Sequence, residues 1–233
     1  MPYRRLPNTD KARIRSMDTA ITMMRDSDYY APVIRPDIMA KAERLLYEFR
    51  NLNTTYIANL ERQMSFSGSD AYQNRLRTAR MYVSHFLLVF NMCVKRGEMK
   101  PSDRTYYSMP ETMSELPDLS SEVSVLQWCE NVIRGEKARM AHGGVPIYNP
   151  TMAKLAVHYD LFNEQYQQHK TLRMLTEDSL QKVAQMRPAV DAMILEMWNS
   201  IEKYFSDKQG EERLKLCRDY GVIYYYRKGE KAD

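Results

Sequence analysis

One stretch in the middle of the chain constrains the fold more than any other. Residues 81–94, MYVSHFLLVFNMCV, hold eleven apolar residues among fourteen, and only Ser84, His85 and Asn91 interrupt them. At helical spacing these apolar side chains occupy nearly every face, which is typical of a helix buried on all sides. Fourteen residues are too few to cross a bilayer, which takes about 20. We therefore expect a central helix that other helices cover.

Helix-start residues and apolar stripes predict both the central helix, which starts at Ser69-Asp70, and the helices that cover it. These helices are expected to begin at Thr9-Asp10, Pro36-Asp37, Ser69-Asp70, Ser120–Glu122, Pro150-Thr151 and Thr176-Glu177, with a short one over residues 211–219. The helix that starts at Ser120 should end at Gly135. The last two long helices should be separated by a turn, either near residue 175 or at Pro188, because proline breaks or kinks a helix.

Two proline-bracketed linkers suggest an internal duplication. Residues 32–41 and 146–154 share a P-x-x-x-P bracket followed by Met-Ala-Lys, and further on Phe90 falls opposite Trp198. A repeat of this kind predicts two similar structural units, although helical apolar spacing alone can produce part of the resemblance. If the halves pack together, Asn91 and Asn199 lie near their contact. The alternative is that each asparagine bonds within its own half.

The expected fold is all-α, a pseudo-duplicated bundle of two three-helix units with long helical hairpins. A single domain, 1–233, would contain the halves 9–98 and 120–207, joined by the loop 99–119, and then a C-terminal helix and tail, 208–233. Within the tail, residues 222–227 (VIYYYR) follow Gly221 and predict a short extended segment. Its pairing partner would be residues 2–6, the segment around Tyr106, or the edge of another chain. A docked, unpaired tail is the remaining alternative.

Charge and cysteine usage narrow the functional classes only a little. The 34 basic and 30 acidic residues give a net charge of +4, a mixed surface that does not by itself indicate nucleic-acid binding. Cys93, Cys129 and Cys217 lack CxxC spacing, which indicates buried, reduced thiols in a reducing compartment. The N-terminal residues contain no apolar signal segment, and no run approaches a membrane span. We therefore expect a cytoplasmic protein with no membrane partner.

Catalytic and metal-binding patterns do not stand out. None of the four histidines has a glutamate three residues before it, as di-iron bundles need. His158 and His169 are eleven residues apart, too far along a helix to share a metal. His85 is expected to be a hydrogen-bonded core residue, and phosphate-binding and nucleophile motifs are absent. We therefore expect no catalytic residues, no metal and no cofactor.

Basic and tyrosine-rich segments provide the candidate interaction residues. These are Arg4, Arg5, Arg75, Arg77, Arg80, Tyr106, Tyr107, Tyr224, Tyr225, Tyr226 and Arg227. Arginine interleaved with aromatic residues suits single-stranded nucleic acid, although Glu211 and Glu212 dilute the positive field.

Three functional hypotheses follow from these residues. The leading one is a non-enzymatic cytoplasmic interaction or scaffold protein that presents helical hairpins and Tyr-rich loops to an unidentified protein partner, with a homo-oligomer as one form of this. The alternative is a nucleic-acid- or ribosome-associated protein that uses its basic, aromatic termini. The third is an enzyme with a pocket between the halves.

Four segments also carry a resemblance to other proteins. They are residues 3–15 (YRRLPNTDKARIR), 82–92 (YVSHFLLVFNM) with RGE at 96–98, 146–151 (PIYNPT) and 220–228 (YGVIYYYRK). On these segments the chain resembles, over its whole length, a family of uncharacterised bacterial all-helical proteins with no assigned activity. The resemblance implies a bacterial, single-module protein. It transfers no catalytic or binding residues.

Overall fold

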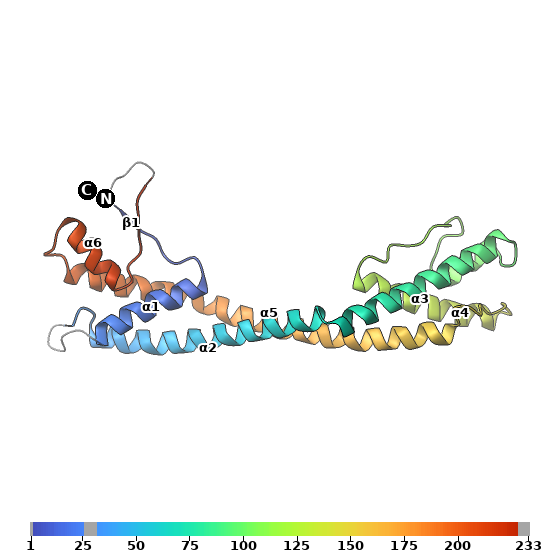
Figure 1. Cartoon of the computed structure of the whole chain (residues 1–233), viewed down its shortest axis with the longest axis horizontal. Helices are drawn as coiled ribbons and strands as arrows, with labels where there is room; N and C mark the ends of the chain where they lie inside the picture. Colours follow the sequence, from blue (N-terminus) through green and yellow to red (C-terminus); the bar gives the residue numbers. More distant parts are fainter. Residues whose placement is uncertain (1, 26–31, 228–233) are drawn as a thin grey trace. The chain divides into compact units, whose positions relative to one another are not determined.

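Helices make up most of the computed structural model, which describes residues 2–25 and 32–227 (Figure 1). Along the chain these are α1 (Asp10–Arg25), α2 (Pro36–Ser67), α3 (Asp70–Lys95), the 3-10 helix η1 (Pro101–Tyr107), α4 (Glu122–Ala141), α5 (Met152–Tyr204) and α6 (Gly210–Asp219). Two short strands, β1 (Tyr3–Arg4) and β2 (Tyr224–Tyr225), lie near the ends. The all-α prediction is confirmed. None of the described helices is both long and apolar enough to cross a membrane.

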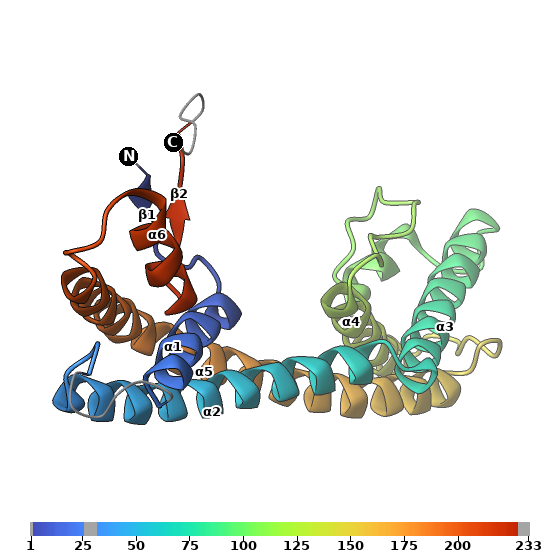
Figure 2. The same cartoon turned by 60° about the vertical axis from the view of Figure 1, so that its left-hand side comes forward.

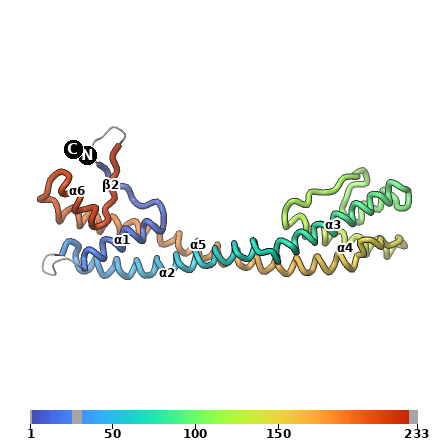
Figure 3. Tube along the Cα trace, viewed as in Figure 1, coloured from blue at the N-terminus to red at the C-terminus, as the bar shows by residue number. Residues whose placement is uncertain are grey.

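The chain forms two compact units that interleave in sequence. Unit 1 comprises Met1–Leu60 and Leu175–Asp233, and unit 2 comprises Glu61–Met174. Helices α2 and α5, which can be followed along the trace in Figure 3, each contribute residues to both units. These bounds differ from those of the expected halves, 9–98 and 120–207, and the internal duplication stays a prediction.

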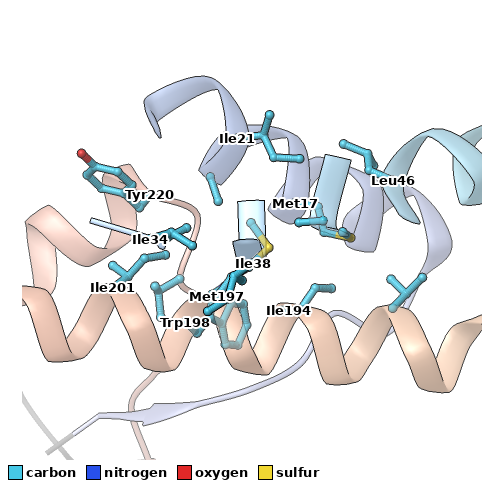
Figure 4. Close-up of a cluster of buried hydrophobic side chains, with 14 of the residues drawn as sticks. Met17, Ile21, Ile34, Ile38, Leu46, Ile194, Met197, Trp198, Ile201 and Tyr220 are labelled. Carbon is cyan, nitrogen blue, oxygen red and sulfur yellow. The ribbon is translucent and has the colours of Figure 1, made fainter. Parts of the chain in front are cut away.

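Unit 1 is built around an apolar core from α1, α2 and α5. Met17, Ile38 and Trp198 are fully or almost fully buried there, and Figure 4 shows them among aliphatic side chains from all three helices. The tail adds Val222, which is also buried. Burial of this many large apolar side chains supplies the main favourable free energy of folding.

The C-terminal tail pairs within the chain. Strand β2 runs antiparallel to β1, with Tyr225 opposite Tyr3 and Tyr224 opposite Arg4 (Figure 2). The backbone N–H of Arg5 also donates to the carbonyl of Ile223, at 3.2 Å. Of the three expected pairing partners, residues 2–6 are therefore the ones observed.

Unit 2 has its own core, from α3, η1, α4 and the first part of α5. Phe86 and Phe90 of α3 are fully buried against the ring of Tyr107. Phe90 thus belongs to one core and Trp198 to the other. Asn91 bonds to Ser114 and Arg104, and Asn199 bonds to Arg4, so each asparagine makes these hydrogen bonds inside its own unit.

Helix α5 is continuous over 53 residues, so the turn expected near residue 175 or at Pro188 is wrong. Thr176 and Ser179 are buried within the helix, and Asn59 of α2 donates to the Ser179 hydroxyl at 3.3 Å. These residues serve helix packing instead of starting a helix. Beside Pro188, Arg187 donates two hydrogen bonds to Asp10 of α1, at 2.9 and 2.8 Å, which braces the helix where the proline removes a backbone donor.

Helix α4 runs past Gly135, where the sequence predicted its end. A Cβ atom at this position would lie 2.4 Å from the backbone oxygen of Tyr106, far inside van der Waals contact. The glycine therefore permits the close approach of η1 to the helix, instead of ending the helix.

The three cysteines are free and buried, as expected.

Candidate interaction surface

The N-terminal arginines and C-terminal tyrosines lie together in unit 1. Arg4 donates to the side-chain oxygen of Asn199 at 2.7 Å and forms an ion pair with Glu202 at 3.3 Å. The Tyr224 hydroxyl donates to the other oxygen of Glu202 at 2.5 Å. Burial and this hydrogen bond both raise the pKa of Tyr224, so the phenol stays protonated.

The other terminal candidates also have neighbours within this cluster. The Arg5 guanidinium lies 5.6 Å from the ring centre of Tyr225, a cation–π contact. The Tyr226 hydroxyl accepts from Arg218, which is itself paired with Glu211 at 2.5 Å. Arg227 is exposed. Carboxylates thus lie among the basic and aromatic side chains and offset part of their positive charge.

The other basic candidates belong to unit 2 and do not join that cluster. Arg75 and Arg77 are exposed on α3, and Arg77 donates to the side chain of Asn74 at 2.6 Å. Arg80 donates to the carbonyl of Ser120 at 3.0 Å and so helps to hold the start of α4 against α3.

The two tyrosines of η1 differ sharply in environment. Tyr106 is half-buried, with its ring beside His142. Tyr107 is fully buried, donates to the Glu136 carboxylate at 2.5 Å and accepts from Arg139 at 2.9 Å. Burial and the bond to Glu136 raise the pKa of Tyr107. Tyr107 is therefore a core residue and is not available to a partner.

Glu136 and Arg139 form a buried ion pair with every carboxylate oxygen engaged. Arg139 donates to both Glu136 oxygens at 2.8 Å, and Ile147 N–H donates to one of them at 3.4 Å. Arg139 also donates to the Val145 carbonyl at 2.6 Å. A second buried contact, from Arg104 to Asn91 at 3.3 Å, holds η1 to α3. These bonds pin loops to helices and leave no polar atom of the Glu136 carboxylate for a substrate.

One further polar cluster joins the starts of α3 and α4 to α5. The Tyr72 hydroxyl lies 3.3 Å from Nδ1 of His169, which is 3.8 Å from a Glu122 oxygen. The ring of Phe66 stacks on His169.

Across residues 2–25 and 32–227, the structure groups no three histidine, cysteine, aspartate or glutamate side chains that could hold a metal ion.

The outer face of α3 carries a row of exposed apolar side chains. Met81, Leu88 and Met92 are 55%, 46% and 58% exposed, and His85 between them is exposed as well. The spacing of 4, 3 and 4 residues aligns the four side chains in one stripe along the helix. Their Cβ atoms point away from the buried face that carries Val83, Phe86 and Phe90. Hereafter the outer face means Met81, His85, Leu88 and Met92.

The exposure of this outer face shows that two expectations about the helix are wrong. The helix is not buried on all sides, and His85 is not a core residue. The sequence contains the stripe as a second apolar set at 3–4 spacing, with His85 as its single polar member. An apolar set of this kind gives the same pattern whether it is covered by the chain itself or by another molecule, so the pattern alone could not separate the two cases.

Basic side chains border the outer face at both ends. Arg77 lies one turn before Met81, and Lys95 lies about one turn after Met92, and both are exposed. The sequence has no aspartate or glutamate from residue 71 to residue 97. The stripe is therefore apolar along its middle and positively charged at its ends.

Comparison with known proteins gives no relative from which a function can be transferred: no family model, curated protein or solved structure matches the chain.

Proposed function

We propose that this protein is a non-enzymatic interaction protein that binds another protein through the outer face of α3. The observation that carries the proposal is the exposure of Met81, Leu88 and Met92 in a single row. Exposed apolar side chains that are scattered singly need no explanation, whereas contiguous apolar patches are typical of interaction sites. Covering the row removes apolar area from water, which favours association.

The composition and support of the outer face suit this role. Methionine side chains are flexible and polarizable, so they adapt to the shape of a partner. The opposite side of α3 is fixed by the buried rings of Phe86 and Phe90. A mobile set of side chains on a rigid helix can bind with little ordering of the backbone, which lowers the entropic cost of association.

Affinity capture from native lysate tests the proposal. The wild-type protein and a Leu88→Glu variant are compared with and without nuclease, and bound proteins are quantified by mass spectrometry. We expect a defined set of proteins to be retained by the wild type and lost with Leu88→Glu, because a carboxylate in the middle of the apolar row would be desolvated on binding.

Met140→Glu is the matched control, because Met140 is 43% exposed on α4, outside the row. This variant should retain the captured set. If Leu88→Glu and the wild type capture the same proteins, the outer face is not the binding surface. If nuclease removes the captured set, the nucleic-acid hypothesis based on the basic termini takes precedence.

A further inference from the structure

We infer that the partner of the outer face is an amphipathic helix whose apolar stripe is bordered by carboxylates at both ends. This inference rests on the proposed function and adds the chemistry of the partner. The row from Met81 to Met92 covers twelve residues, and its ends are about 16 Å apart at the helical rise. It is one side chain wide, so a second helix can place a ridge of its own side chains beside it.

The charges of α3 favour an acidic partner. Arg77 and Lys95 stand about 27 Å apart along the helix at the same rise, and no carboxylate from this helix lies between them to neutralise them. A partner helix with Asp or Glu about one turn beyond each end of its apolar stripe would place one carboxylate near each cation. Such rim pairs contribute to orientation and specificity.

A second copy of the chain fits this face poorly. If two α3 helices met in parallel, Arg77 and Lys95 would each face themselves. If they met antiparallel, with Met81 against Met92 of the other copy, Arg77 would lie beside Lys95 of that copy. Both arrangements bring like charges together, which is unfavourable.

A lipid surface also fits less well than a helix. Helices that lie in a bilayer interface commonly insert tryptophan, phenylalanine and leucine, with basic residues on the polar side. The outer face instead carries two methionines, one leucine and a central histidine, and the two phenylalanines of α3, Phe86 and Phe90, are buried on the opposite side.

Two synthetic helical peptides test the inference with the full-length protein. Both carry leucine at positions i, i+4, i+7 and i+11, and they differ only in having glutamate or lysine one turn beyond each end. Binding is measured by fluorescence anisotropy at low and high salt. We expect the glutamate peptide to bind roughly three- to tenfold more tightly, and the difference to shrink at high salt.

A charge-swapped variant, Arg77→Glu with Lys95→Glu, supplies the decisive control. Both side chains are exposed, and Arg77 donates to Gln73 and Asn74 of its own helix. The swap should therefore leave the fold intact and reverse the preference toward the lysine peptide. Equal binding of both peptides to the wild type, no binding of either, or an unreversed preference would overturn the inference.

The remaining outcomes separate this inference from the proposed function. If Leu88→Glu loses its captured proteins but the peptides show no charge preference, the proposed function stands and the acidic partner is wrong. Self-association of the wild type that Leu88→Glu abolishes would identify a second copy as the occupant and overturn the inference. The wild type is also tested for flotation with vesicles of phosphatidylcholine and phosphatidylglycerol. If it floats with them and Leu88→Glu does not, a membrane surface is the occupant and the inference is overturned.

Discussion

Replacing Gly135 by alanine should destabilise the protein, although alanine is the better helix former. In an exposed helix interior the exchange would stabilise by about 1 kcal/mol. Here the new Cβ would lie 2.4 Å from the Tyr106 oxygen and 2.8 Å from Cδ1 of Tyr107, whereas ordinary contact begins at 3.4 Å. The 3-10 helix η1 would have to move by about 1 Å to accept it.

That movement is opposed by the buried bonds that hold η1. Tyr107 is tied to Glu136 and Arg139, which lie on the same helix as Gly135. Overpacking of a tight core costs about 1–3 kcal/mol, and distortion of the Tyr107 bonds adds to this. After subtraction of the helix-propensity gain, we expect a net loss of about 1–2 kcal/mol.

Urea and thermal unfolding followed by circular dichroism measure this loss. Asn131→Ala on the same helix is the control, since it raises helix propensity without the clash at Gly135, and its stability should stay within about 0.5 kcal/mol of wild type. Hydrogen exchange should also show faster exchange in η1 for Gly135→Ala. A Gly135→Ala protein as stable as wild type, or more stable, would refute the assignment of Gly135 as a packing residue.

Further outcomes follow from the environments of Tyr107, Cys129 and Tyr224. Tyr107→Phe should cost about 1–3 kcal/mol in urea unfolding, because it leaves a buried ion pair without its bridging hydroxyl, whereas Tyr106→Phe should cost less than about 0.5 kcal/mol. Burial raises the pKa of Cys129 from 9.0 to about 12, so this thiol should resist alkylation at pH 8 in the folded protein, as read by mass spectrometry. Because the folded-state pKa is the higher one, the contribution of Cys129 to stability should be complete below pH 9 and be lost as the pH rises toward 12. Tyr224→Phe should lower the melting temperature by removing the bond to Glu202, and Tyr225→Phe, at an exposed position, should not.

Local signals predicted most of the helix boundaries. Ser69 and Ser121 were expected at helix starts, and both cap their helices by accepting from the backbone N–H three residues later. The pairing of the tail with residues 2–6 was one of the expected alternatives, because an extended, β-branched and aromatic segment needs a partner for its backbone groups.

The missed features depend on residues far away in the sequence. Thr176 resembles a helix-start residue in the sequence, but it is buried inside α5, one turn before Ser179, which accepts from Asn59 of α2. Gly135 resembles a helix end until η1, about 30 residues earlier, is seen to approach it. Neither contact is encoded in local propensity, which tertiary packing routinely overrides.

The interaction surface could be predicted only in part. The sequence pattern located the apolar helix, but it predicted that Met81, His85 and Leu88 are covered by other helices of the chain. Among the candidates taken from basic and aromatic composition, Tyr107 is completely buried, and Arg4 and Tyr224 both contact Glu202. Composition identifies side chains that can bind, whereas exposure decides which of them remain available to a partner.

Photo-crosslinking from position 88 tests the central claim most directly. A photoreactive phenylalanine analogue replaces Leu88 in the full-length protein inside the source cells, and the same analogue at Met140 serves as the control. The proposed function predicts a discrete crosslinked protein from position 88 and none of that mass from position 140. The measurement is made in cells that hold the protein at its natural level. If position 88 then reacts only with water and with the chain itself, the assignment of α3 as an interaction surface is contradicted.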